Sequence, residues 1–107
     1  MFFEVKNFKI INCSEIMITA IGGWSDFVFE SNYKPMPLDS LETFVKTNKH
    51  LPDIPSEQQL KEEGLNVNEM FAKQMQKIEE LTLYIIEQQK QIEKLKSEIE
   101  QMKQEKK

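Results

Sequence analysis

Cysteine and histidine are almost missing from this chain of 107 residues, which has one of each, Cys13 and His50. A lone cysteine excludes an intrachain disulfide and a paired-cysteine metal knuckle, so we expect Cys13 to be a small buried apolar residue. His50 has no second histidine with which to share a metal ion, and Ser56 is better used as a helix cap than as a nucleophile. We therefore expect no metal, no cofactor and no catalytic residue, and we expect His50 to bond to backbone near a corner of the chain.

Long apolar runs and basic patches are also lacking. No apolar stretch reaches the roughly 18 residues that a membrane span needs. Glu4, Lys6 and Lys9 interrupt the N-terminal segment MFFEVKNFKI, where a signal peptide would have a continuous apolar core. The net charge is −4 and the pI is near 5.1, which argues against neutralising the phosphates of a nucleic acid. We expect neither membrane insertion nor a nucleic-acid partner.

The residues that are abundant divide the chain into three parts. Most phenylalanines and the only tryptophan lie in the first half, whereas the stretch after Asn66 is almost entirely Glu, Lys, Gln, Ile, Leu and Met. That shift indicates a small head joined to a long helix. We assign residues 1–33 to a β-rich N-terminal head, residues 34–65 to short helices and a proline-rich linker, and residues 66–107 to a coiled-coil helix.

The strands are expected from loose alternation in residues 1–21, where β-branched residues are common and Ile16 and Ile18 share one phase. Gly22-Gly23 then breaks the run. We interpret the segment WSDFVFE that follows as a short strand or extended stretch.

Helix signals begin after Pro35 and Pro37, which hold the chain extended. Asp39 with Glu42 three residues later resembles a capping box, and apolar residues then recur at helical spacing. This pattern predicts a helix over about residues 40–48. Because so short a helix is not stable alone in water, it must dock on something.

The stretch KHLPDIPSEQQL resembles a corner that leads into another helix. Pro52 and Pro55 should end the first helix and hold the linker extended. Ser56 and Gln59 form a capping box, and Gly64 is a stop signal for the brief helix that follows.

The last helix is predicted to start after Asn66, with Glu69 three residues on, and to run without a breaker to the C-terminus. With Ile78 at heptad position a, the a positions are Phe71, Ile78, Ile85, Ile92 and Ile99, and the d positions are Gln74, Leu81, Gln88, Leu95 and Met102. Five large apolar a residues in succession predict a left-handed coiled coil. These ten residues are called the seam below.

The orientation and number of helices in that coiled coil follow less directly. Glu98 at g and Lys103 at the following e suit parallel neighbours. Ile at a with Leu at d favours two helices, whereas Gln74 and Gln88 at d suit polar layers around a threefold axis. The residues alone leave dimer and trimer open.

A second apolar stripe faces away from the seam and needs a cover. It comprises Met75 at e, Leu83 at f and Ile86 at b. We expect the short helices and the proline-rich linker to fold back onto the N-terminal half of the last helix and to cover this stripe with Phe44, Leu51 and Ile54.

The motifs WSDFVFE, KHLPDIPS, GLNVNEM and KIEELTLYIIE occur in this order over residues 24–95. They resemble the C-terminal segment of tail-fibre-like and surface-adhesin-like proteins of Bacteroidetes. The resemblance implies a parallel trimer that caps a longer fibre on a virion or cell surface, and it implies that residues 1–21 could be the last strands of the fibre stalk. The sequence departs from this pattern at Pro35-Met36-Pro37 and in the glutamine-rich C-terminal part of its last helix, from about Gln89.

These observations predict a structural oligomerisation module, a homo-oligomer with a trimer favoured, and not an enzyme. One alternative is a self-cleaving intramolecular chaperone, because such ends contain a Ser-Asp pair like Ser25-Asp26, although Phe27-Val28-Phe29 replaces the basic segment that should follow. The other is a fibre tip whose aromatic residues bind a surface receptor or glycan. The first reading treats those aromatic residues as core or interface.

Overall fold

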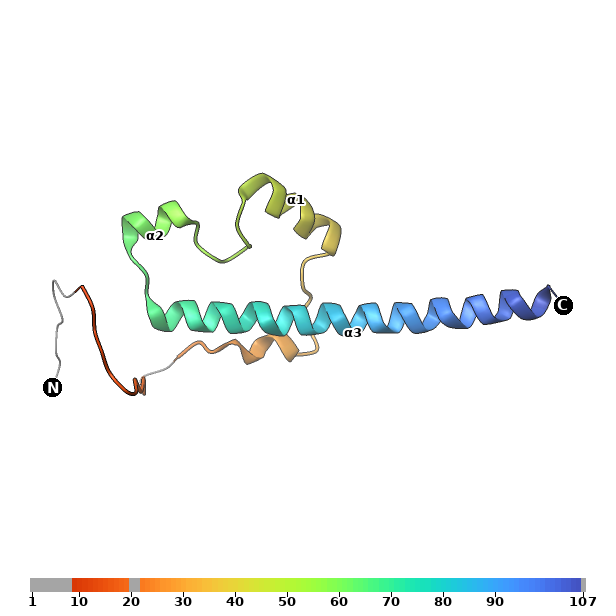
Figure 1. Ribbon diagram of the computed structural model, residues 1–107, viewed down its shortest axis with the longest axis horizontal. Helices are drawn as coiled ribbons and strands as arrows, with labels where there is room; N and C mark the ends of the chain where they lie inside the picture. Colours follow the sequence, from red (N-terminus) through yellow and green to blue (C-terminus); the bar gives the residue numbers. More distant parts are fainter. Residues whose placement is uncertain (1–8, 20–21, 107) are drawn as a thin grey trace.

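The computed structural model describes residues 9–19 and 22–106, and over these ranges its regular elements are all helical (Figure 1). They are the 3-10 helix η1 (Ser25–Phe29), α1 (Leu38–Asn48), α2 (Glu57–Glu63) and α3 (Val67–Glu105). The molecule is elongated, with a longest dimension of 76 Å. The prediction of a mainly helical chain with a long C-terminal helix is confirmed.

The expected N-terminal strands are wrong for the described part of the chain. Residues 9–19 contain no strand, and WSDFVFE forms η1. In a 3-10 helix, residues three apart lie on one side, and Ser25 and Val28 are both buried in this way. A strand would instead need a paired neighbour, which a single copy does not offer here. The rest of the predicted strand region, residues 1–8 and 20–21, lies outside the described residues.

Cys13 corrects a second expectation, because it is exposed rather than buried. The segment around it, residues 9–19, is exposed throughout. Its apolar side chains are therefore not buried by the described part of the chain.

Helix α1 begins earlier than expected, and Asp39 is not its cap. Pro37 precedes the first turn without a side-chain cap. Asp39 lies inside the first turn, where its Oδ1 accepts a hydrogen bond from Ser40 N at 2.9 Å and its charge suits the helix dipole. The helix ends at Lys49, which adopts a left-handed conformation with φ of 63° and donates its N–H to Val45 O.

The corner after α1 is a tight turn rather than the extended linker that the prolines predicted. Ile54 N donates to Leu51 O at 3.2 Å, and Asp53 has a φ of 67°. Proline at the second position and a positive φ at the third correspond to a type II turn, so Pro52 and Asp53 reverse the chain locally.

The remaining start and stop signals are confirmed. Ser56 Oγ accepts from Gln59 N at 3.2 Å, and Gln59 Oε1 accepts from Ser56 N at 2.9 Å, which completes the capping box of α2. Gly64, with φ of 84°, ends that helix. Asn66 Oδ1 accepts from Glu69 N at 3.0 Å and caps α3.

Helix α3 runs for 39 residues without a break, which corresponds to about 58 Å at 1.5 Å per residue. Figure 1 shows η1 along one side of its first half and the α1–α2 segment on the other, while the second half projects beyond the head. Every residue from 85 to 106 is exposed. Among the helices of the described chain, η1 is the one that packs closely on α3, and α1 and α2 contain no buried residue.

We expect Lys49→Gly to be more stable than Lys49→Ala by roughly 1 kcal/mol, because glycine adopts the left-handed conformation without the steric cost that Cβ carries. This order is the reverse of the one found inside a helix. Hydrogen exchange of the α1 amides, which reports local opening, measures the difference. Equal protection in the two variants would contradict the assigned helix end.

Candidate functional site

The inner contact of the head is η1 against α3. The buried Ser25 hydroxyl donates to the carbonyl of Ala72, and Val28 is fully buried. Phe27 packs edge-on against Tyr33 with ring centroids 5.6 Å apart. In the heptad numbering Ala72 is a b position, so η1 covers a side of α3 that lies away from the seam.

A buried carboxyl lies beneath this contact. Glu79, also at b, is only 7% exposed, and its Oε2 atom has no hydrogen-bond partner. Burial raises the pKa of Glu79, and the nearby charge of Asp26 and a hydrogen bond with it raise the pKa further. Burial and the carboxylate of Asp26 therefore both disfavour the charged form of Glu79.

The adjacent carboxyl, Glu80 at c, is in the opposite situation. It accepts hydrogen bonds from Tyr33 Oη, from Gln76 Nε2 at 3.2 Å and from Lys77 Nζ at 3.0 Å. Burial alone would raise the pKa of Glu80, but these three donors outweigh it and lower the pKa below its ordinary value. Burial and the bond to Glu80 raise the pKa of Tyr33 to about 12. Lys77 also reaches Asp53 at 3.5 Å, so the cluster ties the corner turn to α3.

Further along the same side, the chain before α1 is bonded to α3. Tyr84 Oη donates to Met36 O at 2.5 Å, and burial raises the pKa of Tyr84. Leu51 borders a groove of about 260 Å³ beside Leu81 and Tyr84.

His50 is placed by backbone and aromatic contacts, as the structural interpretation predicted. Its Nδ1 lies 2.9 Å from Leu51 O, and its ring meets Phe44 edge-on at a centroid distance of 5.7 Å. Within the described ranges, no set of three or more His, Cys, Asp or Glu side chains is arranged to hold a metal ion.

The seam is open along its whole length. Its eight apolar members are each 46–64% exposed, and Gln74 and Gln88 are exposed as well. The apolar members are Phe71, Ile78, Leu81, Ile85, Ile92, Leu95, Ile99 and Met102. The head makes its hydrogen bonds at the b, c, f and g positions, so the described part of the chain leaves this row about half exposed.

The second stripe and its expected cover are only partly in contact with other groups. Met75 and Leu83 are half-buried, and Ile86 is 47% exposed. Among the three residues expected to cover them, Phe44 and Ile54 are half-buried and Leu51 is 43% exposed. Direct covering of Leu83 and Ile86 by Leu51 and Ile54 stays a prediction.

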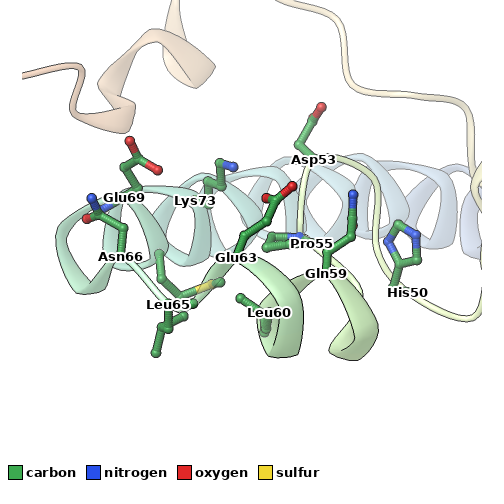
Figure 2. A pocket seen from close by; sticks show the side chains of 12 residues that line it. His50, Asp53, Pro55, Gln59, Leu60, Glu63, Leu65, Asn66, Glu69 and Lys73 are labelled. Atoms are coloured by element: carbon green, nitrogen blue, oxygen red, sulfur yellow. The ribbon is translucent and has the colours of Figure 1, made fainter. Parts of the chain in front are cut away.

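Open grooves lie on both flanks of the seam near the start of α3. On the g side, a groove of about 710 Å³ runs between α2, the corner turn and the first turns of α3 (Figure 2). Leu60, Leu65 and Met70 supply its apolar surface, and Glu63 and Lys73 are among its charged residues. On the e side, a groove of about 430 Å³ includes Trp24 and Phe71.

Ser25, which sequence reasoning singled out, makes a contact between η1 and α3. The hydroxyl of Ser25 is used in packing, through its bond to Ala72. Sequence reasoning missed Tyr33, Glu79, Glu80 and Tyr84. Tyr33 lies outside every predicted element, and carboxylates such as Glu79 and Glu80 at b and c of a coiled-coil helix are ordinarily exposed, so the sequence carried no clear signal for this contact.

Comparison with known proteins found no match: no family model, no curated protein and no solved structure is significantly similar to this chain. None of the described helices combines the length and the apolarity required to cross a membrane.

We expect Glu79→Gln to stabilise the head at neutral pH. The folded-state pKa of Glu79 is raised above 4.5, so the folded state holds more protons than the unfolded state just above that pH, and stability falls as pH rises through this window. The amide is neutral at all these pH values and should remove the fall. Thermal unfolding of the head, followed by aromatic circular dichroism between about pH 4 and 8, measures it.

Glu80→Gln is the matched control, because it changes the neighbouring residue in the same way. The lowered pKa of Glu80 contributes stability above 4.5 that is lost as pH falls through the folded-state pKa. This variant should therefore lose stability at neutral pH. Two variants with the same sign of effect would contradict the assignment of the two carboxyls.

Proposed function

We propose that this chain is a structural oligomerisation module, in which three copies associate in parallel through the seam and hold the C-terminal end of a fibre or surface adhesin in register. The observation that carries the proposal is the exposed seam: eight large apolar residues in a heptad row, on a helix whose other sides carry the head. The fibre context, at a virion or cell surface, rests on the sequence resemblance.

The energetics of α3 support association. The C-terminal half of α3 is exposed and gains no tertiary packing from the described part of the chain. Helix propensity alone is a weak source of stability. Burying one Ile or Leu side chain fully contributes roughly 1.5–3 kcal/mol. A row of eight half-exposed apolar side chains therefore provides a large driving force for covering the seam with identical helices.

The short helices give independent support. No residue of α1 or α2 is buried, although helices of 11 and 7 residues need packing to be stable. In an assembly around a common axis, neighbouring copies would offer α1 and α2 additional surfaces to pack against.

The parallel orientation is supported by Glu98 at g and Lys103 at the following e, which meet across neighbouring helices only in that orientation. Three copies are supported by Gln74 and Gln88, whose side chains can form polar layers around a threefold axis, and by the resemblance to trimeric fibre ends.

We expect Ile92→Asp to dissociate the oligomer, because assembly would bury like charges at one level of the seam. A buried charge without a partner costs about 3–5 kcal/mol. Ser97→Asp is the control, since it adds the same charge at an f position on the same bare part of α3. Light scattering coupled to gel filtration gives the mass of each. A wild-type monomer, or a fully assembled Ile92→Asp, would refute the proposal.

A further inference from the structure

The e-side groove is built from two segments that are distant in sequence. Ile16, Ile18 and Trp24 form one wall, and Phe71 and Ile78 of the seam form the other. The volume is about 430 Å³. Trp24 remains 41% exposed and Ile18 37% exposed, so the wall is unfinished in a single chain.

The chemistry of this groove indicates an apolar occupant. Among the residues that the structure describes, none that borders it is charged, and its polar members are Asn68 and Gln74. Two of its residues, Phe71 and Ile78, are seam a positions. A helix that covers the seam at this level would therefore also contact Trp24. The groove is therefore a widening of the seam toward its e side, and the occupant is the helix that covers the seam.

We infer that this groove binds the first turns of α3 from a neighbouring copy, with the Met70 side chain of that copy against Trp24. The inference rests on the proposed parallel assembly and adds the head to its interface. In parallel coiled coils, a g residue faces the e residue five positions further along the neighbouring helix. Met70 is at g and Met75, which borders the groove, is at the facing e.

Methionine fits this position for chemical reasons. Its unbranched side chain adapts to an irregular apolar groove, and sulfur makes favourable contacts with aromatic rings. Met70 is half-buried and borders the open groove on the opposite flank of its own helix. Each copy thus presents a groove on one flank and its filler on the other, which is the heterologous arrangement that closes into a ring.

The consequence is a register device at the top of the seam. The Ile layers at a repeat every heptad, so apart from the polar layers of Gln74 and Gln88 the seam distinguishes weakly between helices in register and helices shifted by one heptad. The wall of Trp24 and Ile18 occurs once per chain, so it accepts the neighbouring helix in one position. The head then contributes to assembly by fixing the alignment of the copies.

Trp24 is the only tryptophan, so its fluorescence reports on this groove in the intact chain. We expect emission at shorter wavelength and weaker acrylamide quenching in the wild-type oligomer than in the Ile92→Asp variant, whose substitution lies in the bare half of α3. Met70→Lys should keep the oligomeric mass but shift the emission of Trp24 to longer wavelength and increase its quenching. Gln91→Lys, which also places lysine at a g position, should leave both signals at their wild-type values.

The results separate this inference from the proposed function. If the wild type is a monomer by light scattering, the proposed function fails and this inference fails with it. If the wild type is an oligomer and Met70→Lys, still assembled, leaves emission and quenching of Trp24 unchanged, this inference is overturned while the proposed function stands. Because Met70→Lys is compared as an oligomer, unfolding of a dissociated chain does not affect that comparison.

Discussion

A row of eight half-exposed apolar side chains along one edge of the 39-residue helix α3 is the constraint to which the rest of the described structure is related. The head makes its described hydrogen bonds at the b, c, f and g positions of α3, and the apolar residues at a and d stay about half exposed. In the proposed assembly, the head and the neighbouring helices would therefore use different sides of α3.

Several hydrogen bonds and an ion pair join the head to α3. Glu80 collects three donors, whereas Glu79 one residue earlier is buried with an unpartnered oxygen. The pKa values of these adjacent carboxyls are moved in opposite directions, upward by burial and Asp26 at Glu79 and downward by the three donors at Glu80. The hydrogen bond from Tyr33 to Glu80 holds Tyr33 at this level of α3.

The same attachment places Trp24 beside the first seam layers. Ser25 is anchored to Ala72, and Trp24 precedes it in the chain, so the position of the indole follows from the bond of its neighbour. Packing of η1 thereby connects the inner contact of the head to the surface that a second copy would meet.

Much of the local structure could be read from the sequence. Asn66, Ser56, Gln59 and Gly64 act on backbone groups within about four residues, so their caps and stops depend on no distant segment. The heptad row is equally local, because helical periodicity alone sets which residues share a side. These signals determined where α2 and α3 begin and that one edge of α3 is apolar.

Tertiary structure decided what local pattern could not. WSDFVFE alternates well enough for a strand, but Ser25 reaches a carbonyl 47 residues away and the segment folds as η1 against it. Asp53 adopts a left-handed backbone conformation, and its carboxylate accepts a hydrogen bond from Lys77, which lies 24 residues further along the chain. The burial of Glu79 and the exposure of Cys13 likewise depend on which surface the head selects on α3. That selection is a competition between distant segments for the sides of one helix, and no window of neighbouring residues contains both competitors.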